Sequence, residues 1–302
     1  MPHETRRTLG AYVGTSLAWG STFALIKVGL DSLSPVAVGF GRCFFGAATL
    51  LLIARLRRQP LPRGRATWGH LWVVGLLASV IPGIFLPLAE THVSSAFTGI
   101  TAGIIPLATL LYLVTIFRDE KVHPHQFAGL FVGFVGLLVL LGIWHGIGKF
   151  SPWSLAILAL VIASYGLAFP YIKRHVTPLG LDPVALAAAQ QIASAATIAP
   201  LLLWPSSHLM PSLGSLLAVV ALGVFAGGLG FMWNFTTVRV WGSSVASTVE
   251  YTAALVAVLA GITLLHEHLT WYEPVGGAIV IVGALIGWGQ LNGLSRRVRR
   301  AM

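Results

Sequence analysis

The stretch AWGSTFALIK (residues 18–27) decides the fold, because the chain carries it a second time as SYGLAFPYIK (residues 164–173). An aromatic residue before a glycine, a phenylalanine and an isoleucine–lysine pair recur in the same order, 146 positions apart. Glu120 likewise corresponds to Glu267, at an offset of 147. A near-constant offset over a whole half of the chain indicates two tandem copies of one unit.

The boundaries of the two copies follow from how far the matching residues extend. We predict a first repeat over residues 8–146 and a second over residues 152–291. Residues 292–302 follow as a basic tail that we expect in the cytoplasm.

The composition indicates a membrane protein. The chain has 302 residues, of which 56% are hydrophobic and 9% charged, whereas about 25% of an average soluble domain is charged. The apolar residues form runs of about 20, the length that a helix needs to cross the hydrocarbon core. The net charge of +10 does not favour a nucleic-acid partner, because the basic residues lie in short loops between the apolar runs. We therefore expect the protein to lie in the lipid bilayer.

We predict an all-α membrane protein with ten transmembrane helices, arranged as two inverted five-helix repeats. Prolines and glycines separate the apolar runs. The predicted spans are residues 9–30, 35–54, 71–89, 95–117, 125–143, 152–172, 183–204, 212–238, 243–265 and 271–291.

The distribution of lysine and arginine predicts the orientation. With both termini in the cytoplasm, 16 of the 19 basic residues fall in inner segments and Lys149 alone falls in an outer loop. Cytoplasmic loops carry such an excess, so we expect a multi-pass protein of the cell (inner) membrane. Because five spans is an odd number, the second repeat must enter the membrane from the opposite side. Inverted repeats are typical of secondary transporters, whose substrate site lies near the midplane.

Glu250 is the strongest candidate for a substrate-binding or coupling residue. Its predicted helix starts near Ser243, which places Glu250 about 10 Å from the inner face. A charged side chain at that depth is costly and usually functional. It can bind a proton or a substrate amine, and the alternative is a structural carboxyl that is hydrogen-bonded within the bundle. Asn234, preceded by Trp233, is predicted at a comparable depth and is either a ligand or an interhelical hydrogen-bond partner.

Arg42 lies about 10 Å from the outer face by the same count. Its depth therefore separates it from Glu250, and Glu90 and Asp31 are the expected partners. We consider an anion site or a structural ion pair for Arg42 and Glu90, and for Arg42 also snorkelling of its side chain to the interface.

Aromatic residues near the midplane predict a cavity. Trp19 lies about 15 Å into its helix and Tyr165 about 20 Å into its own, although membrane aromatics prefer the interfaces. A cavity flanked by aromatic rings suits flat apolar solutes, and packing between the repeats is the alternative. The predicted wall comprises Trp19, Phe23, Tyr165, Phe169 and Trp233, and the equivalent residues Thr101 and Thr248 are placed on the same axis.

Neither a metal site nor a cofactor is predicted. The pair His123 and His125 and the pair His266 and His268 fall on opposite sides of the membrane, and neither pair has the four ligands of a structural zinc site. The chain contains no phosphate-binding loop of the Walker type, so direct coupling to ATP is not expected. A membrane enzyme acting on lipids would need at least two acidic or histidine residues at one depth, whereas the spans supply only Glu250 well inside.

Several local motifs carry a resemblance to a known family. They are Ala18-Trp19-Gly20-Ser21-Thr22-Phe23, Arg42, Pro106, Glu120 and Glu267-His268-Leu269-Thr270. Their order and spacing resemble the drug/metabolite transporter superfamily, and in particular its EamA-like permeases. The resemblance implies a transporter, rather than an enzyme, that exports small organic solutes such as amino acids, aromatic metabolites or drugs by alternating access, with or without proton coupling. Metabolite exchange is the alternative, and the protein is expected as a monomer or a homodimer.

Overall fold

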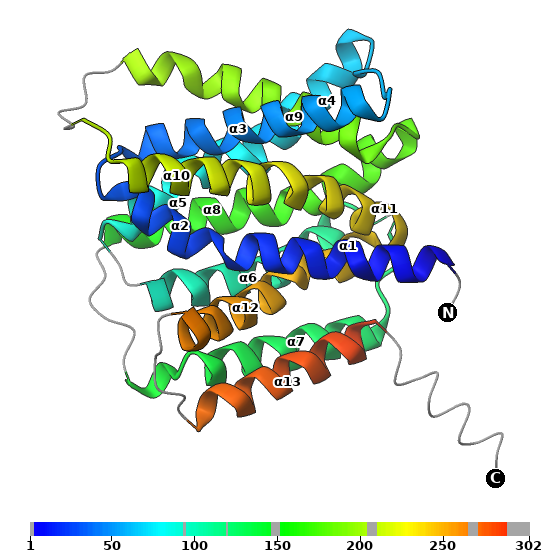
Figure 1. Ribbon diagram of the computed structural model, residues 1–302. Helices are drawn as coiled ribbons and strands as arrows, with labels where there is room; N and C mark the ends of the chain where they lie inside the picture. Colours follow the sequence, from blue (N-terminus) through cyan, green and yellow to red (C-terminus); the bar gives the residue numbers. More distant parts are fainter. Residues whose placement is uncertain are drawn as a thin grey trace.

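The computed structural model describes residues 3–92, 95–118, 120–145, 152–203, 210–264 and 271–288, with side chains except at residues 3, 95–101 and 259–264. All regular secondary structure in these ranges is helical (Figure 1). We refer to residues 3–145 as the first half and to residues 152–288 as the second half.

The first half contains seven α-helices. They are α1 (His3–Gly20), α2 (Thr22–Leu30), α3 (Pro35–Leu56), α4 (Arg65–Gly75), α5 (Ile81–Glu90), α6 (Ser95–Thr115) and α7 (Pro124–Leu140). A π-helical segment, η1 (Leu76–Val80), joins α4 to α5, and a short 3₁₀ turn, η2 (Ile143–His145), follows α7.

The second half contains six α-helices. They are α8 (Pro152–Tyr171), α9 (Pro183–Ile198), α10 (Leu213–Ala221), α11 (Phe231–Ser247), α12 (Val249–Leu264) and α13 (Tyr272–Gly287). Shorter segments extend them, namely η3 (Ile172–Val176), η4 (Thr177–Leu179), η5 (Ala199–Leu203) and η6 (Leu222–Gly230).

Six continuous helical stretches in the described part of the chain are long and apolar enough to cross a membrane. They are Glu4–Leu30, Pro35–Leu56, Arg65–Glu90, Pro152–Leu179, Pro183–Leu203 and Leu213–Ser247. Four shorter apolar helices, Ala102–Thr115, Pro124–Leu140, Val249–Val258 and Tyr272–Gly287, accompany them. The chain is thus a multi-pass membrane protein, and the count of ten spans stays a prediction.

The second helices of the two predicted repeats start in the same way. Ser34 caps α3 by accepting a hydrogen bond from the amide of Ala37 at 3.2 Å, and Asp182 caps α9 by accepting one from Val184 at 2.8 Å. Proline follows each cap, where its fixed φ suits the first turn and no amide hydrogen is needed. The two caps are 148 residues apart, so they are equivalent in sequence and in structure.

Glycines hold α7 and α13 together, and the two helices lie side by side in Figure 1. A side chain on Gly129 would meet the backbone of Gly283 and Gly287, and one on Gly276 would meet the backbone of Gly136 and Leu140. Small residues allow this close approach of membrane helices. Because Gly129 and Gly276 are 147 positions apart, the two halves contribute reciprocal contacts to one interface.

Figure 1 also shows the direction of the halves: α1 begins and α13 ends at one end of the bundle, whereas α8 begins at the other. We call the first of these the termini end. The core of the bundle lies between the halves, where α3 packs against α9 and η6, and α1 packs against α12.

Candidate functional site

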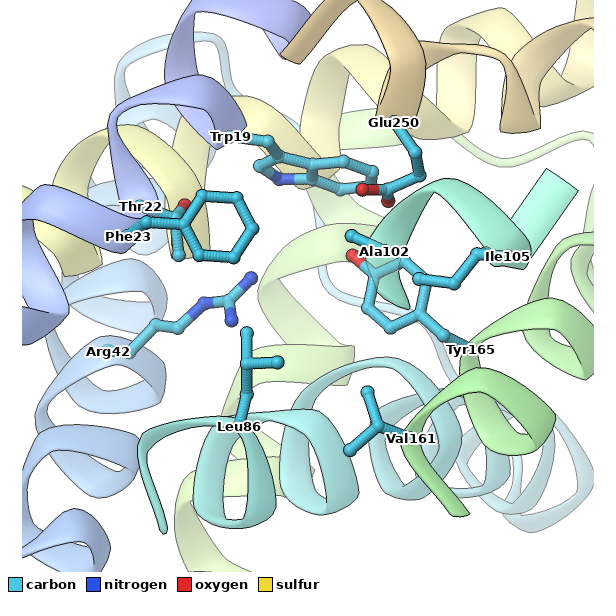
Figure 2. A pocket seen from close by; sticks show the side chains of 10 residues that line it. All are labelled: Trp19, Thr22, Phe23, Arg42, Leu86, Ala102, Ile105, Val161, Tyr165 and Glu250. Carbon is cyan, nitrogen blue, oxygen red and sulfur yellow. The ribbon is translucent and has the colours of Figure 1, made fainter. Parts of the chain in front are cut away.

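One pocket is lined by residues from both halves (Figure 2). The first half supplies α1, α2, α3, α5 and α6, and the second half supplies α8 and α12. The lining residues are Trp19, Thr22, Phe23, Arg42, Leu86, Ala102, Ile105, Val161, Tyr165 and Glu250. Aromatic and aliphatic side chains dominate this lining, with Arg42 and Glu250 as its charged members.

Trp19 and Tyr165 form an aromatic wall of the pocket. Their rings meet edge to face, with centroids 5.7 Å apart, and Trp19 makes a similar contact with Phe231 at 5.5 Å. The Trp19 indole also donates a hydrogen bond of 3.3 Å to the carbonyl of Ala226. Ala226 belongs to the π-helical segment η6, and such segments are frequent at functional sites. The wall is therefore fixed by contacts that cross between the halves.

Arg42 projects from α3 into the pocket, as Figure 2 shows, although only 4% of its surface is exposed. Its guanidinium lies 5.8 Å from the centre of the Phe231 ring. Its Nε atom is buried and has no hydrogen-bond partner among the described residues. A buried cation whose donors are incompletely used is well suited to bind an anion.

Glu250 reaches the same pocket from α12 and is 8% exposed. In Figure 2 its carboxylate lies beside Trp19 and Tyr165 and faces the space into which Arg42 points. The pocket thus presents a basic and an acidic side chain on different walls, with aromatic rings between them.

We expected depth to keep Arg42 and Glu250 from pairing. Both side chains line this pocket, and no ion pair between them is found among the described residues. Two residues about 10 Å from opposite faces of a core about 30 Å thick differ in depth by roughly 10 Å at the backbone. Arg42 projects from α3 and Glu250 from α12 into the same space, so residues predicted at different depths line one pocket (Figure 2). Glu90, one of the two partners expected for Arg42, does not line this pocket, so its pairing with Arg42 stays a prediction. Glu90 Oε1 is buried without a hydrogen-bond partner in the described part of the chain.

Other predicted residues lie outside this pocket. Phe169 is buried behind Tyr165, with ring centroids 5.9 Å apart. Trp233 lines a separate pocket with Arg7 and Arg57. Thr248 hydrogen-bonds with the Tyr12 hydroxyl at 2.8 Å.

Two further predicted residues remain. Asn234 is buried, and its Oδ1 atom has no partner among the described residues. The side chain of Thr101 lies outside the described part of the structure, so its predicted place on the pocket axis stays a prediction.

Sequence analysis missed five of the lining residues. Thr22 follows Trp19 by three positions, so helical periodicity places it on the same face and could have identified it. Leu86, Ala102, Ile105 and Val161 are apolar residues in apolar helices, and no sequence signal distinguishes them from lipid-facing residues.

The pocket has about 40 Å³ of space for water. A single ordered water needs about 10–15 Å³, so the pocket accommodates a few waters and an organic solute requires the walls to move apart. Among the described residues, no group of three or more histidine, cysteine, aspartate or glutamate side chains is placed to hold a metal ion.

Comparison with known proteins identifies the family. The EamA-like transporter family matches the chain twice, over residues 8–142 and 152–287. The chain belongs to the EamA-like transporter family. It is therefore a membrane transporter, and the pocket lined by Arg42 and Glu250 is the candidate for the solute site.

Relatives of this EamA-like transporter are distant but cover nearly its whole length. It is 25% identical over 287 residues to the "Uncharacterized inner membrane transporter YedA" of Escherichia coli K12, which spans 93% of this chain and 90% of that protein. It is also 25% identical to the "Probable terminal-alkyne amino-acid exporter" of Streptantibioticus cattleyicolor, with 93% of each chain covered.

A solved structure, described as "Crystal structure of protein", shares the fold of this EamA-like transporter. It has a TM-score of 0.75 and 22% sequence identity, and the match covers 93% of this chain and 98% of that one. The likeness extends over the whole bundle and concerns the fold alone.

Proposed function

We propose that this protein is a secondary transporter of the cell (inner) membrane that exports amino acids or related small zwitterions by alternating access. In this proposal the two halves are inverted repeats with boundaries at residues 8–146 and 152–291, both termini are cytoplasmic, and the termini end faces the cytoplasm. The observation that carries the proposal is the pocket between the halves, in which Arg42 and Glu250 face a common space beside aromatic rings.

The chemistry of the walls supports an amino acid as substrate. An α-amino acid carries a carboxylate and an ammonium group on one carbon, and Arg42 and Glu250 are their respective counter-charges. Guanidinium binds carboxylate strongly because it offers several donors in one plane. Trp19 and Tyr165 then provide an apolar surface for the side chain. The exporter named in Streptantibioticus cattleyicolor is consistent with this class of substrate.

The reciprocal contacts of the halves support alternating access. Gly129 and Gly276 make equivalent contacts in the interface of α7 and α13, and α1 and α8 begin at opposite ends of the bundle (Figure 1). Two such halves can exchange conformations and expose the pocket to either side in turn. The small volume of the pocket corresponds to a state in which its walls are closed together.

Glu250 supplies a mechanism for coupling to protons. Its carboxylate can carry a proton or pair with the ammonium group of a substrate, but a protonated carboxyl has lost the charge that attracts the ammonium. Mutually exclusive occupation of one site by proton and substrate produces exchange of the two across the membrane. Proton entry then drives substrate exit.

Uptake of a labelled amino-acid panel into proteoliposomes, with and without a pH gradient, tests the proposal. The wild type should respond to the gradient, and Glu250→Gln should lose that response while it retains gradient-independent counterflow. Glu90→Gln is the matched control, because it removes another carboxyl that is buried but outside the pocket. A wild type that ignores the gradient, or a Glu250→Gln variant that still responds to it, would contradict proton coupling at Glu250.

A further inference from the structure

A carboxylate of the first half caps a helix of the second half. Glu120 follows α6, and its Oε1 atom accepts a hydrogen bond of 2.8 Å from the backbone amide of Ser243. Ser243 follows a break in α11 and begins the helical segment that leads into α12. Glu250 lies seven residues further along, about two helical turns from this contact.

The break in α11 at Gly242 leaves room for the same carboxylate. Gly242 has φ of 81° and ψ of 174°, a conformation that favours glycine. A Cβ atom at this position would collide with Glu120 Oε1. The missing side chain therefore allows the turn before the helix and also leaves room for the carboxylate that caps it.

The chemistry of the contact is that of a helix cap. The first amides of a helix have no partner within it, and the start of a helix carries partial positive charge. Glu120 satisfies one such amide and supplies a negative charge. The hydroxyl of Ser243 donates a second hydrogen bond, of 3.2 Å, to the carbonyl of Phe169. The start of this helix is thus tied to α8 and to the segment after α6.

The second oxygen of the Glu120 carboxylate is not used by the helix cap. This Oε2 atom is buried without a hydrogen-bond partner among the described residues. Beside it lies a cavity of about 430 Å³ whose lining includes Glu120 and the cations Lys121, Lys173 and Arg174. A carboxylate released from the Ser243 amide would therefore face a cavity with basic residues in its lining.

We propose that Glu120 is a positioning residue for transport, a latch that holds the Glu250 helix in place and keeps the pocket closed toward the termini end. The proposal rests on alternating access as the mode of transport. Opening toward the termini end requires the halves to separate there, and the bond from Glu120 to Ser243 crosses between them. Release of the latch precedes access of the cytoplasm to Glu250.

Labelling of a single cysteine measures the latch directly. The native Cys43 is buried and is replaced in Cys43→Ala, and Ser247→Cys then places a reporter in the fully buried turn between Ser243 and Glu250. Inverted membrane vesicles expose the termini end to a membrane-impermeant maleimide. Glu120→Ala should raise the labelling rate roughly fivefold, the factor expected for loss of one helix cap.

Three further variants separate a latch from a general effect. Glu120→Gln keeps a carbonyl acceptor of the same shape and should label at close to the parent rate. Gly242→Ala disturbs the same contact from the other side and should label as fast as Glu120→Ala. Glu4→Ala removes an exposed carboxylate from the same end of the bundle and should have no effect.

Unchanged labelling in Glu120→Ala, with thermal stability retained, would overturn the latch. If Glu120→Ala does not fold, Gly242→Ala decides the matter, and labelling at the parent rate in that variant overturns the latch equally. Failure of the proposed function is distinguishable from this result. If Glu120→Ala raises the labelling rate as expected but the wild type moves no amino acid, the latch is supported and the proposed substrate class is wrong.

Discussion

Arg42 and Glu250 line one pocket although they belong to different halves of the chain and are separated by more than 200 positions. Neither half contains this pair of charges alone, because the position equivalent to Arg42, 148 residues further on, is Gln190. The fold is therefore symmetric in its packing and asymmetric in the chemistry of its pocket. Such asymmetry lets one cavity distinguish the two ends of a zwitterion.

The Arg42→Lys substitution tests the geometry of the carboxylate site. Lysine preserves the charge but loses the planar set of donors that bind a carboxylate with two hydrogen bonds. We expect KM for amino acids to rise about tenfold or more, as follows from loss of a charged hydrogen bond of about 1.5–3 kcal/mol. Initial rates of uptake over a range of substrate concentrations measure it. An unchanged KM would show that the carboxylate of the substrate does not bind to Arg42.

Competition between protons and substrate at Glu250 predicts a pH dependence. As pH on the substrate side falls, a growing fraction of Glu250 is protonated, so the apparent affinity for amino acids should fall in the wild type. Glu250→Gln should show a flat profile over the same range. Equilibrium binding of a labelled amino acid at several pH values measures both proteins. If binding falls with pH in the same way in both proteins, Glu250 is not the residue at which protons and substrate compete.

Trp19 contributes to the pocket through its ring and through one hydrogen bond. Trp19→Phe retains an aromatic wall and loses the bond to Ala226, so we expect a loss of stability of about 0.5–1.5 kcal/mol with selectivity largely kept. Trp19→Ala opens the wall and should cost about 3–5 kcal/mol. Thermal unfolding and competition by a series of amino acids of increasing size report the two effects. Equal selectivity in both variants would show that the ring does not contact substrate.

The interface of α7 and α13 predicts a stability effect that is independent of transport. A methyl group at Gly129 meets backbone atoms of Gly283 and Gly287, so Gly129→Ala should destabilise the bundle by about 1–3 kcal/mol through overpacking. Gly69→Ala is the control, because a Cβ at that helical position meets nothing within 4 Å. The control should be neutral or slightly stabilising. Unfolding temperatures in detergent compare the variants, and equal values would contradict the assigned packing.

The main features of the fold could be predicted because they depend on periodic signals. Runs of apolar residues and the offset between Trp19 and Tyr165 predicted helices and a repeat, and the family matches the chain over two corresponding segments. Trp19, Phe23, Tyr165 and Glu250 were also predicted for the site, and all four line the pocket. These residues stand out because aromatic and charged side chains are unusual at that depth.

The rest of the site could not be predicted, because it depends on the directions of side chains and on contacts between distant segments. Counting residues along a helix gives the depth of a backbone atom, but it does not give the reach of the Arg42 side chain. Leu86 and Val161 line the pocket only because of how their helices are turned. The cap that Glu120 places on Ser243 joins positions 123 residues apart, and no local pattern indicates it.

The most direct test of the account compares ligands and variants in one cycle. Binding of phenylalanine, of phenethylamine, which lacks the carboxylate, and of N-acetylphenylalanine, which lacks the ammonium, is measured for the wild type, Arg42→Ala and Glu250→Gln. Effects that depend on one contact are not additive. Arg42→Ala should therefore weaken phenylalanine and leave phenethylamine unchanged, and Glu250→Gln should weaken phenylalanine and leave N-acetylphenylalanine unchanged. Equal losses for all three ligands in each variant would contradict recognition of a zwitterion by this pocket.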